Sequence, residues 1–161
     1  MNLFVLRSKI IDEIEERERR SRNAICFNVP VLKNQDGSEV RYIEVAKKLM
    51  SDVAFADADS MVQAFRFGKP KPNGAVRPLM IRFKAKADRN LFLQNCRQAQ
   101  LVTDDQPPLN LWSKADLTPD QREAELALVQ ELKRRRAGGD EVIIRYGKIV
   151  PKNVIVPDQR L

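Results

Sequence analysis

Arginine and lysine side chains are the residues of this sequence whose type and spacing could do chemistry, and that chemistry is the binding of polyanions. The stretch 66–89 carries eight basic residues against one acidic residue, Asp88, so its net charge of +7 equals that of the whole chain. The segment "RERRSR" at 17–22 adds four arginines beside Glu18. A concentrated basic footprint favours a nucleic-acid partner over a face that only keeps the protein solvated.

The residue types that carry out catalysis are largely missing. The sequence has no histidine, which excludes Ser-His-Asp and Cys-His catalysis as well as histidine-ligated metals. Cys26 and Cys96 lie far apart in apolar surroundings, so we expect reduced core thiols rather than a zinc site. The acidic groups at 57–59 and 104–105 are typical of turns. We therefore expect no catalytic residue, no metal and no cofactor, and a protein that is not an enzyme.

The N-terminal residues have the period of a helix. Leu3, Leu6, Ile10 and Ile14 step by three and four, which predicts a helix over 1–16 within an N-terminal domain of residues 1–22. A helix this short is unstable alone in water, so it must pack on the domain, pair with another chain or fray. Its apolar stripe favours the end of a coiled coil, with these four residues mediating homo-oligomerisation. No apolar run reaches the ~20 residues of a membrane span, so we expect no membrane partner.

The middle of the chain alternates strand and helix patterns. Strands are predicted at 23–30, 60–68, 76–84 and 108–113, with helices capped by Ser38 and Asp88. The resulting β-α-β-β-α-β order is that of a ferredoxin-like sandwich over residues 23–113, with both helices on one face. On the third strand, the core-facing alternation falls on Leu79, Ile81 and Phe83.

A small α+β domain is predicted over 114–161. Its helix has an explicit start, with Thr118 as N-cap, Pro119 at the first helical position and Gln121 closing a capping box. The helix should end at Gly138, and a strand or tight hairpin about Gly147 and one more strand in 153–161 should follow.

The central arrangement, with its basic flap between the second and third strands, resembles an RNA-recognition motif (RRM). The usual stacking aromatics are replaced by Cys26 in the first strand and by Pro78 and Met80 in the third. The layout as a whole resembles the first-open-reading-frame protein of LINE-type (non-LTR) retrotransposons. Three segments carry this resemblance: "RERRSRNAICFNVP", "AFRFGKPKPNGAVRPLMIRF" and "KADLTPDQREAELALVQELKRRRAGGDEVIIRYGKIV".

This resemblance implies a partner and an assembly. The partner is single-stranded RNA or DNA, bound without strong sequence preference, with nucleic-acid chaperone activity. The assembly is a trimer through the N-terminal helix, and the short coil leaves a dimer open. Cytoplasmic ribonucleoprotein particles, and the nucleus as a further compartment, are the implied locations. The alternative is a protein–protein interaction module whose RRM-like sheet has lost RNA binding.

Phosphates would be held by cations rather than by rings in this interpretation. Tyr146 is the one credible stacking ring, or else it caps the core of the small domain, and Trp112 is expected to pack between the two domains. Residues 133–136 are either a solvated helix end or a binding face, and we expect them to contribute less than Arg82 and the flap. The candidate nucleic-acid-binding residues are Arg19, Arg20, Arg22, Arg66, Lys69, Lys71, Arg77, Arg82, Lys84, Arg145, Tyr146 and Lys148.

Overall fold

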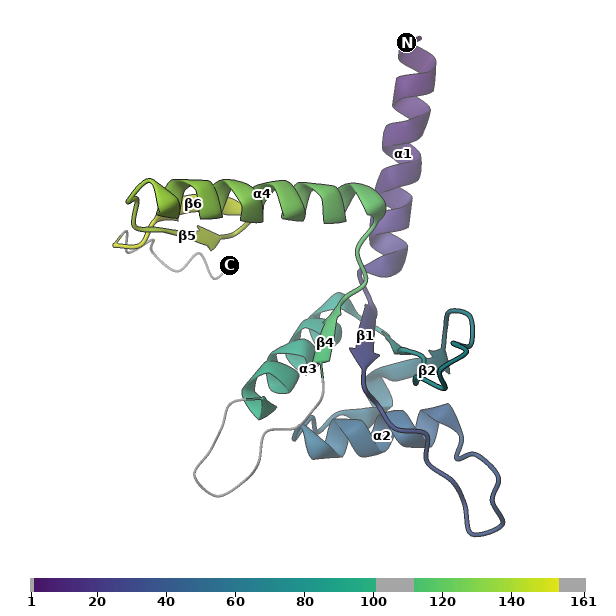
Figure 1. Cartoon of the computed structure of the whole chain (residues 1–161). Helices are drawn as coiled ribbons and strands as arrows, with labels where there is room; N and C mark the ends of the chain where they lie inside the picture. The colour runs from purple at the N-terminus through teal and green to yellow at the C-terminus, as the bar shows by residue number, and fades with distance from the viewer. Residues whose placement is uncertain (1, 101–111, 154–161) are drawn as a thin grey trace. The chain divides into compact units, whose positions relative to one another are not determined.

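Residues 2–100 and 112–153 are described by a computed structural model, and Figure 1 labels most of their helices and strands. The chain divides into two units, Met1–Asp116 and Leu117–Leu161. The second unit begins at Leu117 rather than at the predicted 114, because the last strand of the sheet continues to Ala115. The first unit contains α1 (Leu3–Arg20), β1 (Asn23–Phe27), α2 (Tyr42–Asp52), the 3₁₀ helix η1 (Ala58–Ser60), β2 (Met61–Arg66), β3 (Leu79–Phe83), α3 (Lys86–Ala99) and β4 (Trp112–Ala115). The second contains α4 (Pro119–Ala137), β5 (Val142–Arg145) and β6 (Lys148–Pro151).

The four strands of the first unit form one antiparallel sheet in the order β2-β3-β1-β4. Strand β1 is central, and its Ile25 lies opposite Met80 of β3 and opposite Lys114 of β4. The predicted class is confirmed at this level: the chain is α+β, with a four-stranded antiparallel sheet and an N-terminal helix. The strand predicted at 108–113 lies partly outside the described residues, and the observed β4 begins at Trp112.

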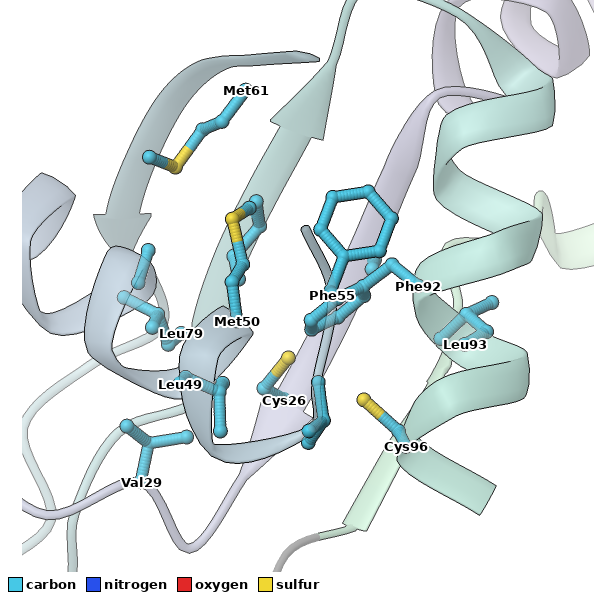
Figure 2. Packing of buried hydrophobic residues seen from close by; sticks show 14 of the residues in the cluster. Cys26, Val29, Leu49, Met50, Phe55, Met61, Leu79, Phe92, Leu93 and Cys96 are labelled. Atoms are coloured by element: carbon cyan, nitrogen blue, oxygen red, sulfur yellow. The ribbon is translucent and has the colours of Figure 1, made fainter. Parts of the chain in front are cut away.

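One face of the sheet is covered by α2 and α3, which share a single hydrophobic core with it (Figure 2). Leu79, Ile81 and Phe83 are fully buried in this core, as their alternation predicts. The rings of Phe55, Phe83 and Phe92 pack together with centroid separations of 5.3 to 5.8 Å. Because α2 and α3 both contact the same face, neither of them covers the opposite face of the sheet.

The two cysteines lie inside this core. Cys26 of β1 and Cys96 of α3 are free thiols and are both fully buried (Figure 2), as predicted. Burial raises the pKa of both thiols, because a thiolate is poorly solvated among apolar side chains. Their role is therefore packing.

Strand β2 contains a β-bulge that decides which way its side chains point. The register shifts between Met61 and Gln63, so Val62 is an inserted residue. Because side chains alternate along a strand, one inserted residue reverses the face of every residue after it. Arg66 therefore lies opposite the core residue Leu79, on the helix-covered face.

Two helix starts differ from the prediction. Helix α2 begins at Tyr42, so Ser38 does not cap it; its hydroxyl instead donates to Asp36 over 2.6 Å in the preceding turn. Helix α3 begins at Lys86, which places Asp88 inside the first turn rather than at the cap. A carboxylate in that turn still interacts favourably with the helix dipole.

Helix α1 continues beyond the predicted residue 16 to Arg20, through the arginine-rich segment. Asn2 caps its start by accepting a hydrogen bond from the backbone N–H of Phe4. None of the residues Leu3–Arg20 is buried. Within residues 2–100 and 112–153, no helix combines the length and the apolarity that crossing a membrane requires.

Helix α4 starts as the sequence predicts. The Thr118 hydroxyl oxygen accepts from the backbone N–H of Gln121 (3.2 Å), and the Gln121 side-chain oxygen accepts from the backbone N–H of Thr118 (3.0 Å). This reciprocal pair is a capping box, which satisfies two donors at the helix start. The helix ends at Ala137, directly before Gly138. The strand predicted in 153–161 lies almost wholly outside the described residues.

Candidate nucleic-acid interface

The face of the sheet that α2 and α3 do not cover, which we call the open face, carries three rows of side chains. Residues directly opposite one another in neighbouring strands lie on the same face, so the strand register defines these rows. The polar row is Gln63, Arg82 and Asn23; the apolar row is Phe65, Met80 and Ile25, ending at Lys114; the aromatic row is Phe27 and Trp112. Asn23 and Phe27 are four residues apart on β1, so the rise per residue of a strand puts the polar and aromatic rows about 13 Å apart.

Arg82 is oriented by the polar row. Its Nε donates to Asn23 Oδ1 over 3.1 Å, and one terminal nitrogen lies at 3.5 Å from Gln63 Oε1, a long and weak hydrogen bond. Asn23 in turn donates to Asp116 (3.0 Å), which also accepts from Arg20 of α1 (3.1 Å). Both partners of Arg82 are neutral amides, so its guanidinium is held in place while its positive charge is not neutralised.

The sequence analysis expected Arg66 to face solvent, but the structure buries it. Only 8% of its surface is exposed, because the bulge at Val62 turns it to the helix-covered face. Its terminal nitrogens donate to the carbonyl oxygens of Arg77 (2.8 Å) and Pro30 (3.0 Å), and its Cζ lies 5.9 Å from the centroid of the Tyr42 ring. Its buried Nε has no partner among the described residues, and burial lowers the pKa of its guanidinium. Arg66 therefore joins three segments of the fold, and little of its side chain is open to solvent.

The basic flap is the segment 67–78 between β2 and β3. Lys69 and Lys71 are exposed on it, and Arg77 is half-buried, donating to the Gly68 carbonyl oxygen over 3.3 Å. In the described part of the chain, no ion pair involves these three cations or Lys84, which follows β3. The flap precedes β3 and Lys84 follows it, so these four positive charges lie at opposite ends of that strand, where they are available to an anion.

The arginines at the end of α1 are in a different situation. Arg19 and Arg20 share the carboxylate of Glu16, at 2.7 and 2.5 Å. The hydrogen bonds from Arg19 and Arg20 lower the pKa of Glu16, and the hydrogen bond to Glu16 raises the pKa of Arg20. Arg20 is also held by Asp116, whereas Arg22 is exposed. Since exposed ion pairs are worth less than ~1 kcal/mol, a phosphate can compete for Arg19 more easily than for Arg20.

The hairpin of the second unit displays an aromatic ring at its tip. Arg145 and Lys148 are the last paired residues, and between them Tyr146 and Gly147 have φ values of 50° and 71°. Two successive positive φ values are what a type I′ turn requires, and a bulky residue adopts them only at a cost. Tyr146 is 80% exposed, so it does not cover the core of its unit.

The side chains predicted to mediate oligomerisation are all exposed on α1. Leu3, Leu6, Ile10 and Ile14 have exposed fractions of 84%, 47%, 52% and 59%. Their spacing places them on one face of the helix. This apolar stripe is therefore available to a partner.

The sequence analysis gave no binding role to three residues of the open face, and it expected one of them, Trp112, to pack between the two domains. Trp112 is 60% exposed, and its ring centroid lies 5.5 Å from that of Phe27 at an interplanar angle of 39°. The Lys114 Nζ lies 5.3 Å from the centroid of the same Phe27 ring. The available signal was the two-residue spacing of Trp112 and Lys114, which puts both on one face of a strand.

The candidate residues thus fall into separate groups. The first unit holds the open face with Arg82, the flap with Lys69, Lys71 and Arg77, and the end of α1, whereas the hairpin tip belongs to the second unit. No protein-family model matches this chain, and a comparison with curated proteins finds no match either.

Proposed function

We propose that this protein binds single-stranded nucleic acid, RNA or DNA, mainly through its phosphates and with weak sequence preference. The observation that carries the proposal is the set of cations without ion-pair partners among the described residues, above all Lys69, Lys71 and Lys84. Arg134 and Arg135 of α4, by contrast, already pair with carboxylates at 2.6 and 2.9 Å. A phosphate therefore displaces less at the flap than at α4.

The sheet supports the proposal through its topology. The order β2-β3-β1-β4, with both helices on one face, suits a ferredoxin-like sandwich of the RRM type. An RRM binds single strands on the face that its helices leave uncovered. In this proposal, the first unit is an RRM-like domain and the second unit is a small accessory domain.

The wider setting we propose is that of a LINE-type retrotransposon protein. The exposed apolar stripe of α1 supports a homo-oligomer, a trimer or a dimer. Nucleic-acid chaperone activity and a place in cytoplasmic ribonucleoprotein particles, with the nucleus as a further compartment, belong to the same proposal.

A salt titration tests the proposal. Binding of a labelled single-stranded oligonucleotide, followed by fluorescence anisotropy, should weaken steeply with salt, because each phosphate contact releases a counterion. The logarithm of the affinity should fall with the logarithm of salt concentration by about 0.7 per phosphate contacted. An affinity that does not change with salt would rule the proposal out.

Matched variants locate the site. A Lys69→Ala/Lys71→Ala double variant and Arg82→Ala should each weaken binding to all sequences alike and reduce the salt slope by about 0.7 per contact. A variant with alanines at 134–136 removes three charges but should weaken binding less, since Arg134 and Arg135 are ion-paired. If the α4 variant loses binding while Arg82→Ala keeps it, the site lies on the second unit. Circular dichroism checks that each variant is folded.

The alternative function, a protein–protein interaction module, rests on one observation. Arg82 already donates to Asn23 and Gln63 and can be read as part of a closed polar network. In that case the charge of the flap only solubilises the protein, and the same salt titration detects no oligonucleotide binding at low salt.

A further inference from the structure

Trp112 is exposed to an extent that packing does not explain. Tryptophan is large and is usually well buried, yet here 60% of its surface is exposed on the edge strand β4. The ring is nevertheless fixed, because it contacts Phe27 of the neighbouring strand at a centroid distance of 5.5 Å. The two residues lie directly opposite each other in the register. A held ring with a free surface is suited to receive another flat group.

The surroundings of the two rings decide which flat group this is. Lys114 lies within cation–π distance of Phe27, at 5.3 Å, and no ion pair involves it in the described ranges. Arg82 lies on the same face, in the polar row, which is about 13 Å from the row of the two rings when measured along the strands. An aromatic surface flanked by uncompensated cations matches a nucleobase with its phosphates, because stacking and charge are then both satisfied. An apolar protein partner would leave these charges without compensation.

We infer that Phe27 and Trp112 form a platform on which an unpaired nucleobase stacks, with Lys114 binding the adjoining phosphate. This inference rests on the proposed function and adds a contact with bases to a binding mode otherwise made of phosphate contacts. The platform selects single strands, because the bases of a duplex are not free to stack on a protein ring. It is sequence-tolerant, since every base has a flat face.

The position of the platform explains why the sequence did not reveal it. The sequence analysis placed the missing stacking positions at Cys26, Pro78 and Met80, but Cys26 faces the helix-covered core, so its assignment was wrong. The rings of the platform instead come from the last residue of β1 and the first residue of β4. A base bound there would lie at one edge of the open face, and its strand could run toward Arg82.

Abasic oligonucleotides separate this inference from the proposed function. An oligothymidine of about ten nucleotides, within the usual site size of a single-strand binding domain, is compared with an abasic strand of equal length that keeps the phosphates and lacks the bases. Trp112 is the single tryptophan of the chain, so its fluorescence reports directly on the platform. We expect oligothymidine to quench this fluorescence and the abasic strand to bind without quenching it.

A tryptophan variant completes the test, with binding measured by anisotropy of the labelled strand. Trp112→Ala should weaken oligothymidine binding by between about 5-fold and about 150-fold, the range that ~1–3 kcal/mol per stacked base gives, while abasic binding and the salt slope stay unchanged. Trp112→Phe should restore part of the loss. If both strands bind and Trp112→Ala weakens neither, or weakens both alike, the platform is refuted and the proposed function stands. If neither strand binds the unmodified protein, the proposed function itself fails.

Discussion

Replacing Arg66 by alanine should destabilise the first unit, because this arginine ties together segments that are far apart in the sequence. Its guanidinium donates to the carbonyl oxygens of Pro30, after β1, and of Arg77, at the end of the flap. It also lies beside the ring of Tyr42, at the start of α2. The variant Arg66→Ala removes all three contacts at once and leaves two carbonyl oxygens without their donor.

The magnitude follows from the contacts. A hydrogen bond from a charged donor contributes about 1.5–3 kcal/mol, and a cation–π contact about 0.5–1 kcal/mol. Against this stands the cost of burying the guanidinium, whose Nε has no partner among the described residues. Because alanine also relieves that cost, we expect the free energy of unfolding to fall by about 2–3 kcal/mol rather than by the full sum.

Urea unfolding followed by the fluorescence of Trp112 measures this effect in the first unit, since Trp112 belongs to β4 and is the chain's single tryptophan. The matched control is Arg77→Ala, which removes one charge from the neighbouring flap but keeps the backbone carbonyl that Arg66 contacts. We expect it to change the unfolding free energy by less than about 1 kcal/mol. Arg66→Lys keeps the charge, but an ammonium group lacks the planar guanidinium that bridges two carbonyl groups. Its loss of unfolding free energy should therefore lie between those of Arg66→Ala and Arg77→Ala.

Binding gives the result that would refute this account of Arg66. We expect Arg66→Ala to leave the salt slope unchanged, because no phosphate contact is lost, whereas Arg77→Ala should reduce it. If Arg66→Ala is as stable as the original protein and reduces the salt slope, the side chain contacts phosphate directly and does not hold the fold together.

The other predictions concern the hairpin, the thiols and α1. Tyr146→Asn should stabilise the second unit by about 1 kcal/mol, since asparagine tolerates a positive φ, while weakening oligonucleotide binding; thermal unfolding by circular dichroism and anisotropy measure the two effects, and an unchanged affinity would show that the ring takes no part. Cys26 and Cys96 should resist Ellman's reagent in the folded protein and react fully in urea; because burial raises the pKa of both thiols, stability should be complete below about pH 8.5 and decline as pH rises above it, and a stability that is constant up to pH 10 would contradict this. Ile10→Gln should abolish concentration-dependent association seen by light scattering, whereas Asp12→Asn on the opposite face of α1 should not; a strictly monomeric original protein would refute the prediction.

The features that the sequence predicted well depend on residues close together in the chain. The capping box of α4 needs only Thr118 and Gln121, so its geometry follows from local spacing whatever the rest of the fold does. The core alternation of Leu79, Ile81 and Phe83 is likewise local, because a strand places every second residue on one face. These elements could be assigned without knowing their neighbours.

The features that the sequence did not predict depend on the partner strand. Met61 faces the core, so regular alternation would put Phe65 on the helix-covered face and Arg66 on the open face. The inserted Val62 reverses this. A bulge is a mismatch between two strands, so it is invisible in either strand alone. The same reason hid the platform, since Phe27 and Trp112 meet only through the pairing of β1 with β4.

The availability of each cation, in contrast, can be traced to local spacing. Glu16 lies three residues before Arg19 and four before Arg20 on one helix, and that spacing brings opposite charges together. The flap 67–78 contains no acidic residue, and its prolines and glycines prevent a helix that would bring one near. Its cations therefore have no acidic neighbour within the flap, and no ion pair among the described residues reaches them from elsewhere. If Arg82 and Lys84 join the three flap cations in contacting phosphates, the salt slope should approach about −3.5, whereas a slope near −0.7 would mean that a single contact is made.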